Sequence, residues 1–192
     1  MATRTHAREV VAQLLYAYGS GNDGIANFME EILQEHKIKN AQNEFAKALF
    51  NGVLEHLEEV DLRIKHQVKN WDFERIGDME RAILRLSAYE ILFSGIDKAI
   101  LINEALEITK NFSNETSTKF INGILDGIAK NATLKLDFIK QTLQSQATQS
   151  TKEVIKKETL NSKKSKSLES KGFQNKDKKL KKKDSTFKKA EK

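Results

Sequence analysis

The chain has 192 residues and a mass of 21.9 kDa, which is enough for one ordinary domain and an appendage. It contains no cysteine, and this excludes disulfide frameworks, thiol nucleophiles and cysteine-ligated zinc. It also contains no proline and only 9 glycines, so it lacks the turn residues that a many-stranded sandwich or barrel requires. Helix is therefore the expected secondary structure.

The net charge of +6 is concentrated at the C-terminus. Residues 145–192 contain 16 Lys and 6 acidic residues, a net charge of +10, which leaves −4 for residues 1–144. The few scattered apolar residues of the C-terminal segment cannot offset the entropy lost on ordering it. We therefore expect an acidic helical domain over residues 1–144 and a disordered Lys-rich tail over residues 145–192.

Neither a signal peptide nor a membrane span is evident in the sequence. The N-terminus lacks an uninterrupted apolar region, and no stretch approaches the roughly eighteen apolar residues that a membrane helix needs. A cytoplasmic protein without membrane contact is expected.

Apolar residues recur at helical spacing through most of residues 1–144 and predict an all-α domain. Asn22 or Asp23 is positioned to cap the second helix. The pattern over residues 40–71 is long for one globular helix, so a bend or break is expected between Gly52 and Asp61. The predicted helices cover residues 7–18, 25–33, 40–71, 79–93, 100–112, 120–128 and 134–143.

The helix over residues 79–93 has apolar residues around nearly its whole circumference, which is typical of a helix at the centre of a domain. A second stripe on this helix contains Leu84 beside Glu80 and Ser87. The stripe faces either a partner protein or neighbouring helices of the same domain, and periodicity alone favours the neighbouring helices. Glu90 falls within the main apolar stripe, so a buried ion pair or helix-cap bond is predicted for it.

No catalytic or metal-binding motif is present in the sequence. The four histidines, at positions 6, 36, 56 and 66, lack the spacing that would bring two of them onto one helical face as zinc ligands. There is no Gly-rich nucleotide-binding loop and no Gly-x-Ser-x-Gly nucleophile motif. The sequence therefore favours a non-enzymatic binding protein without a catalytic residue, a metal or a cofactor.

The strongest binding signals lie at the start of the first helix. Arg4 and Arg8 are one helical turn apart with His6 between them, an arrangement that suits phosphate contact or stacking on bases. The alternative is an ordinary charged helix start, although arginine is unfavourable beside the positive end of a helix dipole. Tyr16, near Gln13 and opposite the apolar face, is a candidate for stacking on an unpaired base.

A second candidate segment runs from residue 111 to residue 120. Within it, Phe112, Ser117, Lys119 and Phe120 place two aromatic rings, a hydroxyl and a lysine around a helix N-terminus. This composition suits single-stranded RNA or phosphate. Packing of both phenylalanines in the core is an equally good interpretation.

Four sequence blocks resemble the NusB transcription-antitermination family in order and spacing, and together they span most of residues 1–140. The blocks contain Arg4, Arg8-Glu9, Gln13 and Leu15-Tyr16; Glu80-Arg81-Ala82-Ile83-Leu84-Arg85-Leu86 followed by Tyr89-Glu90-Ile91; Ile102-Asn103-Glu104-Ala105 followed by Phe112; and Lys119-Phe120-Ile121-Asn122-Gly123-Ile124-Leu125-Asp126.

This resemblance implies an all-α fold of about seven helices in two packed helical subdomains, without catalysis. It implies binding to single-stranded boxA-type RNA of nascent ribosomal RNA transcripts together with NusE, a small-subunit ribosomal protein, in an antitermination complex on RNA polymerase that supports rRNA transcription and maturation. The RNA-binding residues that it implies are Arg4, His6, Arg8, Gln13, Tyr16, Phe112, Ser117, Lys119 and Phe120. The NusE-binding residues that it implies are Glu80, Arg81, Leu84 and Ser87. The resemblance therefore assigns the second stripe of the helix over residues 79–93 to a partner, whereas periodicity alone favours its burial.

The sequence departs from the family pattern in three places. Its N-terminal arm carries Arg4 and Arg8 where many relatives are dense in arginine, and residues 95–98 lack the proline common before the third block. The Lys-rich tail has no counterpart in the family signature. The tail either adds sequence-independent RNA affinity or only keeps the protein in solution.

Two other classes of function compete with RNA binding. The first is a helical protein-interaction module or homodimer whose acidic body binds no RNA. The second is an RNA methyltransferase, since NusB-like domains also occur fused to such enzymes, but no nucleotide-binding or S-adenosylmethionine motif supports it here. The sequence leaves open the RNA sequence, the oligomeric state and the order in which NusE and RNA bind.

Overall fold

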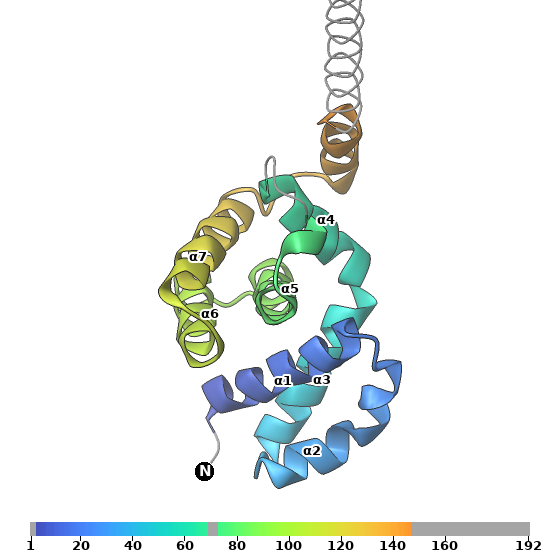
Figure 1. Cartoon of the computed structure of the whole chain (residues 1–192), viewed down its shortest axis with the longest axis vertical. Coiled ribbons are helices and arrows are strands. Elements are labelled where there is room, and N and C mark those ends of the chain that lie inside the picture. The colour runs from blue at the N-terminus through green and yellow to red at the C-terminus, as the bar shows by residue number, and fades with distance from the viewer. Residues whose placement is uncertain (1–2, 69–72, 147–192) are drawn as a thin grey trace, which may run out of the picture. The chain divides into compact units, whose positions relative to one another are not determined.

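The computed structural model describes residues 3–68 and 73–146, and this part of the chain is helical throughout, with no strand (Figure 1). The helices are α1 Arg4–Gly19, η1 Asp23–Phe28, α2 Met29–Glu35, α3 Ala41–Glu55, α4 Leu57–Gln67, η2 Phe73–Arg75, α5 Asp78–Phe93, α6 Lys98–Phe112 and α7 Glu115–Lys130, where η marks a short 3₁₀ helix. A further helical stretch begins at Leu136 and reaches Gln146. The prediction of an all-α fold is confirmed.

Helices α1 to α7 belong to a compact unit that ends at Leu143. The tail predicted for residues 145–192 lies outside the described residues from residue 147 onward. None of the described helices is long and apolar enough to cross a membrane.

Side-chain caps fix the starts of three helices. Thr3 accepts a hydrogen bond from the backbone N–H of His6 at α1, and Asp97 and Asn114 cap α6 and α7 in the same way. The cap predicted at Asn22 or Asp23 is wrong, because a 3₁₀ helix begins there instead and Asn22 makes no side-chain cap bond. The predicted break in the long third pattern is confirmed at His56, where α3 ends and α4 begins.

Helix α5 lies at the centre of the domain, as its apolar circumference predicted. It packs against α1, α3, α4, α6 and α7, and Figure 1 shows it nearly end-on in the middle of the other helices. Helices α1 to α3 form one group and α4 to α7 the other, with α5 in contact with both. The core residues of α5 therefore point in several directions, and they include Ala82, Ile83, Leu84, Leu86 and Ala88.

Glycines lie at two close approaches between helices. A Cβ atom added to Gly52 of α3 would overlap the phenol ring of Tyr89 on α5. A Cβ atom on Gly127 of α7 would overlap the side chain of Gln67 on α4. Glycine therefore allows neighbouring side chains to pack directly on the helix backbone at both positions.

Candidate functional site

The predicted RNA-binding residues come from three elements, namely α1, the end of α6 and the start of α7. The side chain of Asn111 on α6 donates a hydrogen bond to Glu9 on α1. The hydroxyls of Ser113 and Ser117 both donate to Glu80 Oε1 on α5, at 2.6 and 2.8 Å. The loop between α6 and α7 is therefore held against both α1 and α5.

Two of the predicted aromatic side chains are exposed, one on α1 and one at the end of α6. Tyr16 is 42% exposed and Phe112 is 38% exposed. Tyr16 follows Glu9 by seven residues and so shares its face of α1, while Glu9 in turn contacts Asn111, the neighbour of Phe112. Exposed aromatic rings of this kind suit stacking on unpaired bases.

Of the other predicted RNA-binding residues, Arg4 and Lys119 are exposed, whereas Gln13, Ser117 and Phe120 are half-buried. Lys119 forms an ion pair of 2.8 Å with Glu115, and both side chains are largely exposed. Such a pair contributes little to stability, so the ammonium group remains available to a phosphate.

Arg4 is positioned by Phe45, which lies within the apolar pattern predicted over residues 40–71. Its guanidinium carbon lies 5.1 Å from the ring centroid of Phe45 on α3, and the guanidinium carbon of Arg8 lies 5.2 Å from the same ring. These distances fit cation–π contact. Phe45 occupies an apolar position in the helical pattern of α3, as a core residue would. The sequence therefore gave no sign of its contact with the two arginines.

Arg8 was predicted to be accessible to RNA, but the structure places it inside the domain. It is only 5% exposed, and its Nε and Nη2 atoms donate to the two oxygens of Glu90 at 2.8 Å each, while Nη1 donates to Glu104 at 3.2 Å. Burial lowers the pKa of Arg8, but the hydrogen bond and charge of Glu90 outweigh it and raise this pKa above its ordinary value. The predicted buried ion pair of Glu90 is confirmed. Arg8 therefore joins α1, α5 and α6 from inside the domain and presents no free guanidinium to RNA.

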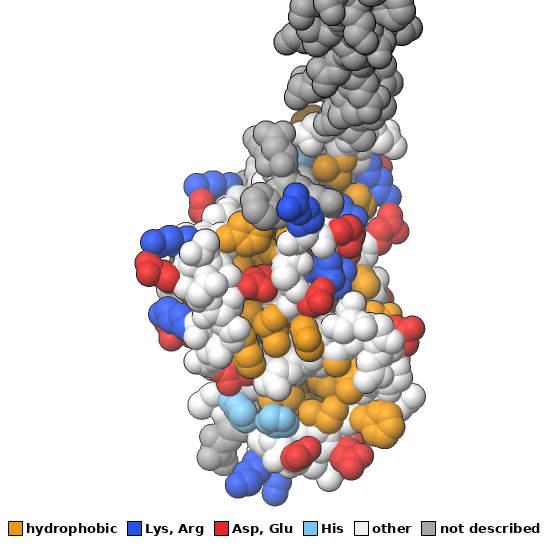
Figure 2. All heavy atoms as spheres, viewed as in Figure 1, with side chains coloured by type: hydrophobic (Ala, Val, Ile, Leu, Met, Phe, Trp, Pro, Cys, Tyr) orange, Lys and Arg blue, Asp and Glu red, His pale blue; other side chains and the backbone are white. Residues whose placement is uncertain are grey.

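His6 connects the start of α1 to the loop between α2 and α3. Its Nε2 atom lies 3.2 Å from the backbone oxygen of His36, and its Nδ1 atom lies 3.3 Å from Glu9. The two histidine rings have centroids 6.0 Å apart. Figure 2 shows hydrophobic side chains in the middle of one face of the molecule and, below them, two neighbouring histidines. The sequence did not point to this loop as part of the site.

The residues expected to bind NusE do not form an exposed stripe. Leu84 has no exposed surface and Ser87 is 3% exposed, because α4 and α7 also pack on α5. The accessibility that the family resemblance implied for these two residues is therefore wrong. Their burial is the alternative that periodicity alone favoured. Arg81 is half-buried and pairs with Asp78 at 2.5 Å.

Glu80 is the remaining residue of this set and is half-buried at the start of α5. Burial opposes its ionisation, but the hydroxyls of Ser113 and Ser117 outweigh this effect and hold the pKa of Glu80 below its ordinary value of 4.5. Glu80 therefore stands as a carboxylate between the predicted partner-binding and RNA-binding residues.

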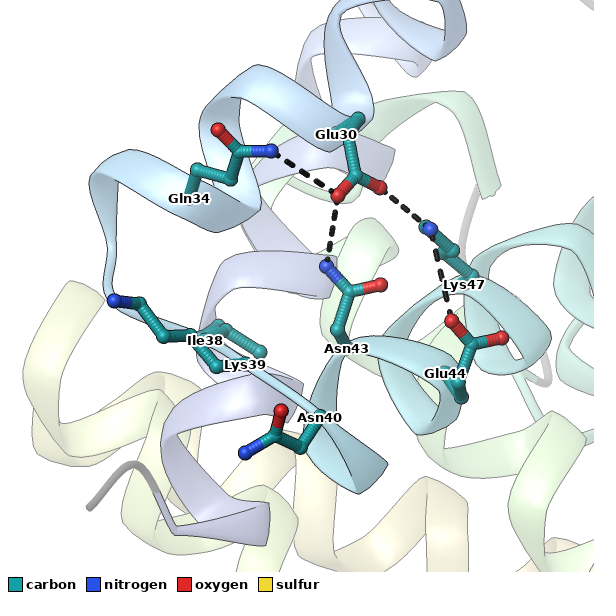
Figure 3. Close-up of a pocket in the computed structure, with 8 residues that line it drawn as sticks. All are labelled: Glu30, Gln34, Ile38, Lys39, Asn40, Asn43, Glu44 and Lys47. Atoms are coloured by element: carbon teal, nitrogen blue, oxygen red, sulfur yellow. Dashed lines mark hydrogen bonds and ion pairs between the residues drawn. The ribbon is translucent and has the colours of Figure 1, made fainter.

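A polar pocket of about 620 Å³ lies between α2 and α3 (Figure 3). Glu30 lies inside it and accepts hydrogen bonds from Gln34 and Asn43 at 3.3 Å each and an ion pair from Lys47 at 2.5 Å. The bond from Lys47 is the main reason why the pKa of Glu30 is lowered. These groups satisfy one another, and no cluster of three or more His, Asp or Glu suited to a metal occurs in the described ranges.

An all-helical scaffold that exposes aromatic and cationic side chains belongs to a class of protein suited to binding other molecules. Residues 5–130 match the NusB family. The chain belongs to the NusB family, and this places it among transcription antitermination factors rather than enzymes.

Curated relatives support this assignment over nearly their whole length. The transcription antitermination protein NusB of Wolinella succinogenes is 56% identical over 128 residues, which cover 67% of this chain and 95% of that protein. The NusB protein of Helicobacter pylori strain P12 is 50% identical over 135 residues, which cover 70% of this chain and 98% of that protein.

Solved structures show the same fold. The chain matches NusB of T. maritima with a TM-score of 0.64 and 34% identity, over 71% of this chain and 97% of that one. It also matches a chain from a structure of the antitermination factors NusB and NusE in complex with double-stranded RNA, with a TM-score of 0.60 and 30% identity over 66% of this chain and 96% of that one.

Proposed function

We propose that this protein binds boxA-type RNA of nascent ribosomal RNA transcripts together with NusE, as part of an antitermination complex on RNA polymerase in the cytoplasm. The observation that carries the proposal is the likeness, at 30% identity, to a structure of NusB and NusE with RNA, over 96% of the matched chain. The arrangement of exposed side chains around the start of α1 supports it.

The RNA-binding surface in this proposal lies over the junction of α1, α6 and α7. Tyr16 and Phe112 offer rings for base stacking, and Arg4 and Lys119 offer positive charge to phosphates. Gln13, His6, Ser117 and Phe120 complete this surface as half-buried neighbours. The bond between Asn111 and Glu9 holds the α1 and α6 parts of the surface in register.

NusE contact in this proposal centres on Glu80 and Arg81 at the start of α5. Because Glu80 accepts hydrogen bonds from Ser113 and Ser117, a partner that engages this carboxylate also acts on the loop that carries RNA-binding residues. This link gives NusE a direct structural route to change RNA affinity. It predicts that NusE and RNA each tighten the binding of the other by the same factor.

The test is fluorescence anisotropy of a labelled boxA-type RNA with the full chain, with and without NusE, against a scrambled RNA of equal length. The Lys-rich tail is present with both RNAs, so any affinity that ignores sequence appears equally with each. Selective binding that tightens with NusE is expected.

Tyr16→Ala is expected to weaken binding by about 5- to 150-fold, because base stacking on an aromatic ring contributes about 1–3 kcal/mol. Lys130→Gln, at the far end of α7 from Ser117, serves as the control. Equal affinity for boxA-type and scrambled RNA would refute sequence-selective recognition. Binding of NusE without any RNA binding would instead identify a helical protein-interaction module.

A further inference from the structure

The start of α1 supplies less positive charge to RNA than its sequence suggests. Residues 1–36 contain two Lys or Arg residues, Arg4 and Arg8. Arg8 is buried with its guanidinium bound to Glu90 and Glu104, so Arg4 is the one whose charge reaches the surface. RNA that crosses the first turn of α1 therefore needs cations from another element to neutralise its neighbouring phosphates.

We propose that the loop between α2 and α3, residues 36–40, supplies these cations and extends the RNA path beyond α1. Its two lysines, Lys37 and Lys39, would contact backbone phosphates of the RNA. This inference rests on the proposed function and adds a second element to the same surface.

The loop and the helix that follows it each contact the first turn of α1. His6 Nε2 lies 3.2 Å from the backbone oxygen of His36, at the beginning of the loop. Arg4 lies over the ring of Phe45, one turn into the helix that follows the loop. His6 therefore contacts the start of the loop that carries Lys37 and Lys39, and Arg4 lies over the start of the helix that follows this loop.

The fold holds the two lysines outward. Ile38 between them has no exposed surface, and neither has Leu33 on α2. The backbone N–H of Ile38 donates to the oxygen of Leu33, and the N–H of Lys37 donates to that of Gln34, both at 2.9 Å. These two bonds form the Schellman motif that ends many helices, and burial of Ile38 between two exposed lysines fixes the direction of both.

Lys37 occupies a backbone position that favours glycine. Its φ angle is 58°, and among the described non-glycine residues positive φ occurs only here and at Asn40, in the same loop. Glycine is the usual residue at this position of a Schellman motif, because a Cβ atom is unfavourable there. A lysine at this strained position indicates a use for its charge, either toward RNA or toward the negative end of the α2 dipole.

The two lysines are also available for a ligand. Lys47, Lys110, Lys119, Lys130 and Lys140 all form ion pairs with carboxylates. Lys37 and Lys39 form no ion pair with any other described residue and are exposed. In Figure 3 the side chain of Lys39 points away from Glu30, whose charge Lys47 already neutralises.

Acidic residues limit where the RNA path runs. Glu30 and Gln34 face α3 across the pocket, as their contacts with Lys47 and Asn43 show. Glu31 and Glu35 lie one position further round α2 and are exposed on its outer side. The outer side of α2 therefore repels RNA, and the path lies over the loop.

The experiment compares five forms of the full chain: wild type, Arg4→Ala, Lys37→Gly, Lys37→Gly with Lys39→Gln, and the control Lys130→Gln with Lys135→Gln. Each form is titrated with labelled boxA-type RNA by fluorescence anisotropy over a series of salt concentrations, and separately with NusE. The control pair removes the same charge from the last residue of α7 and from the segment that follows it. The tail is present in every form, so its contribution cancels in the differences.

The loop double variant is expected to bind more weakly at low salt, with a salt slope smaller by about 1.4, since each phosphate on a single strand contributes about 0.7. A fourfold rise in salt then costs the wild type about sevenfold more affinity than it costs this variant. The control pair keeps the wild-type slope. Lys37→Gly is expected to keep or raise the thermal midpoint while it weakens RNA binding, because glycine relieves the positive φ.

Three results would overturn the inference. Wild-type affinity and slope in the loop variants, with Arg4→Ala still weakening binding, would exclude the loop while the proposed function stands. A lower thermal midpoint of Lys37→Gly with unchanged RNA binding would assign this lysine to the helix dipole. Loss of NusE binding with intact RNA binding would make the loop a protein contact. Absence of RNA binding by the wild type would refute the proposed function itself.

Discussion

Replacement of Arg8 by methionine tests whether this buried arginine holds three helices together. Methionine keeps the length and flexibility of the side chain but leaves Glu90, which is 3% exposed, as a buried carboxylate without its two 2.8 Å bonds. Breaking a buried ion pair from one side costs about 3–5 kcal/mol. Since the whole free energy of unfolding of such a domain is about 5–15 kcal/mol, the Arg8→Met variant is expected to be close to its folding limit.

Two matched variants separate the buried pair from its exposed neighbour. Glu104 contacts Arg8 at 3.2 Å and its side chain is 27% exposed, so Glu104→Gln is expected to cost about 1 kcal/mol or less. In the double variant Arg8→Met with Glu90→Met, the unpaired charge is gone and most of the lost stability returns. The recovery is incomplete because the contact of Arg8 with the Phe45 ring, at 5.2 Å, is lost in both variants.

The free energy of unfolding is measured by urea denaturation, followed by far-ultraviolet circular dichroism. If Arg8→Met costs no more than Glu104→Gln, the buried pair does not hold the helices as described. The variant is also titrated with RNA at a temperature where it is fully folded. Weaker RNA binding by that folded form would show that Arg8 contacts RNA and would contradict its purely internal role.

Two further predictions concern α5 and the glycines. The pKa of Glu80 is below 4.5 in the folded protein, so its stabilising effect is fully present above about pH 4.5 and disappears as the pH falls through its folded pKa. Glu80→Gln is therefore expected to flatten the fall of the thermal midpoint in this acid range. An unchanged slope would contradict the bonds between Glu80 and the two serines. Gly52→Ala is expected to destabilise by about 1–3 kcal/mol, because its Cβ would overlap the Tyr89 ring. Gly123→Ala, with no atom within 4 Å of the new Cβ, is expected to stabilise by up to about 1 kcal/mol, and equal urea midpoints for the two variants would refute the close contact of α3 and α5.

Local patterns in the sequence determined most of the secondary structure. The apolar spacing predicted the all-α fold, the break near His56 and the central place of α5, because each depends on residues only a few positions apart. The exposure of Tyr16 followed from the same spacing, since it lies opposite the apolar face of α1. The prediction of a helix cap at Asn22 was wrong because a 3₁₀ helix begins at Asp23 and Asn22 makes no side-chain cap bond.

Only the tertiary structure decided which of the candidate residues reach the surface. Periodicity shows which face of a helix is apolar, but it does not show how many helices cover that helix. Periodicity favoured burial of the stripe that contains Leu84 and Ser87, whereas the family resemblance implied a partner surface, and the packing of α4 and α7 on α5 shows that both residues are buried. Arg8 stands 82 residues from Glu90 in the chain, and no local pattern joins two such distant charges. The same packing brings His36, at the start of the loop that carries Lys37 and Lys39, into contact with His6 of α1, because contacts between distant segments are fixed by the folded core rather than by neighbours in sequence.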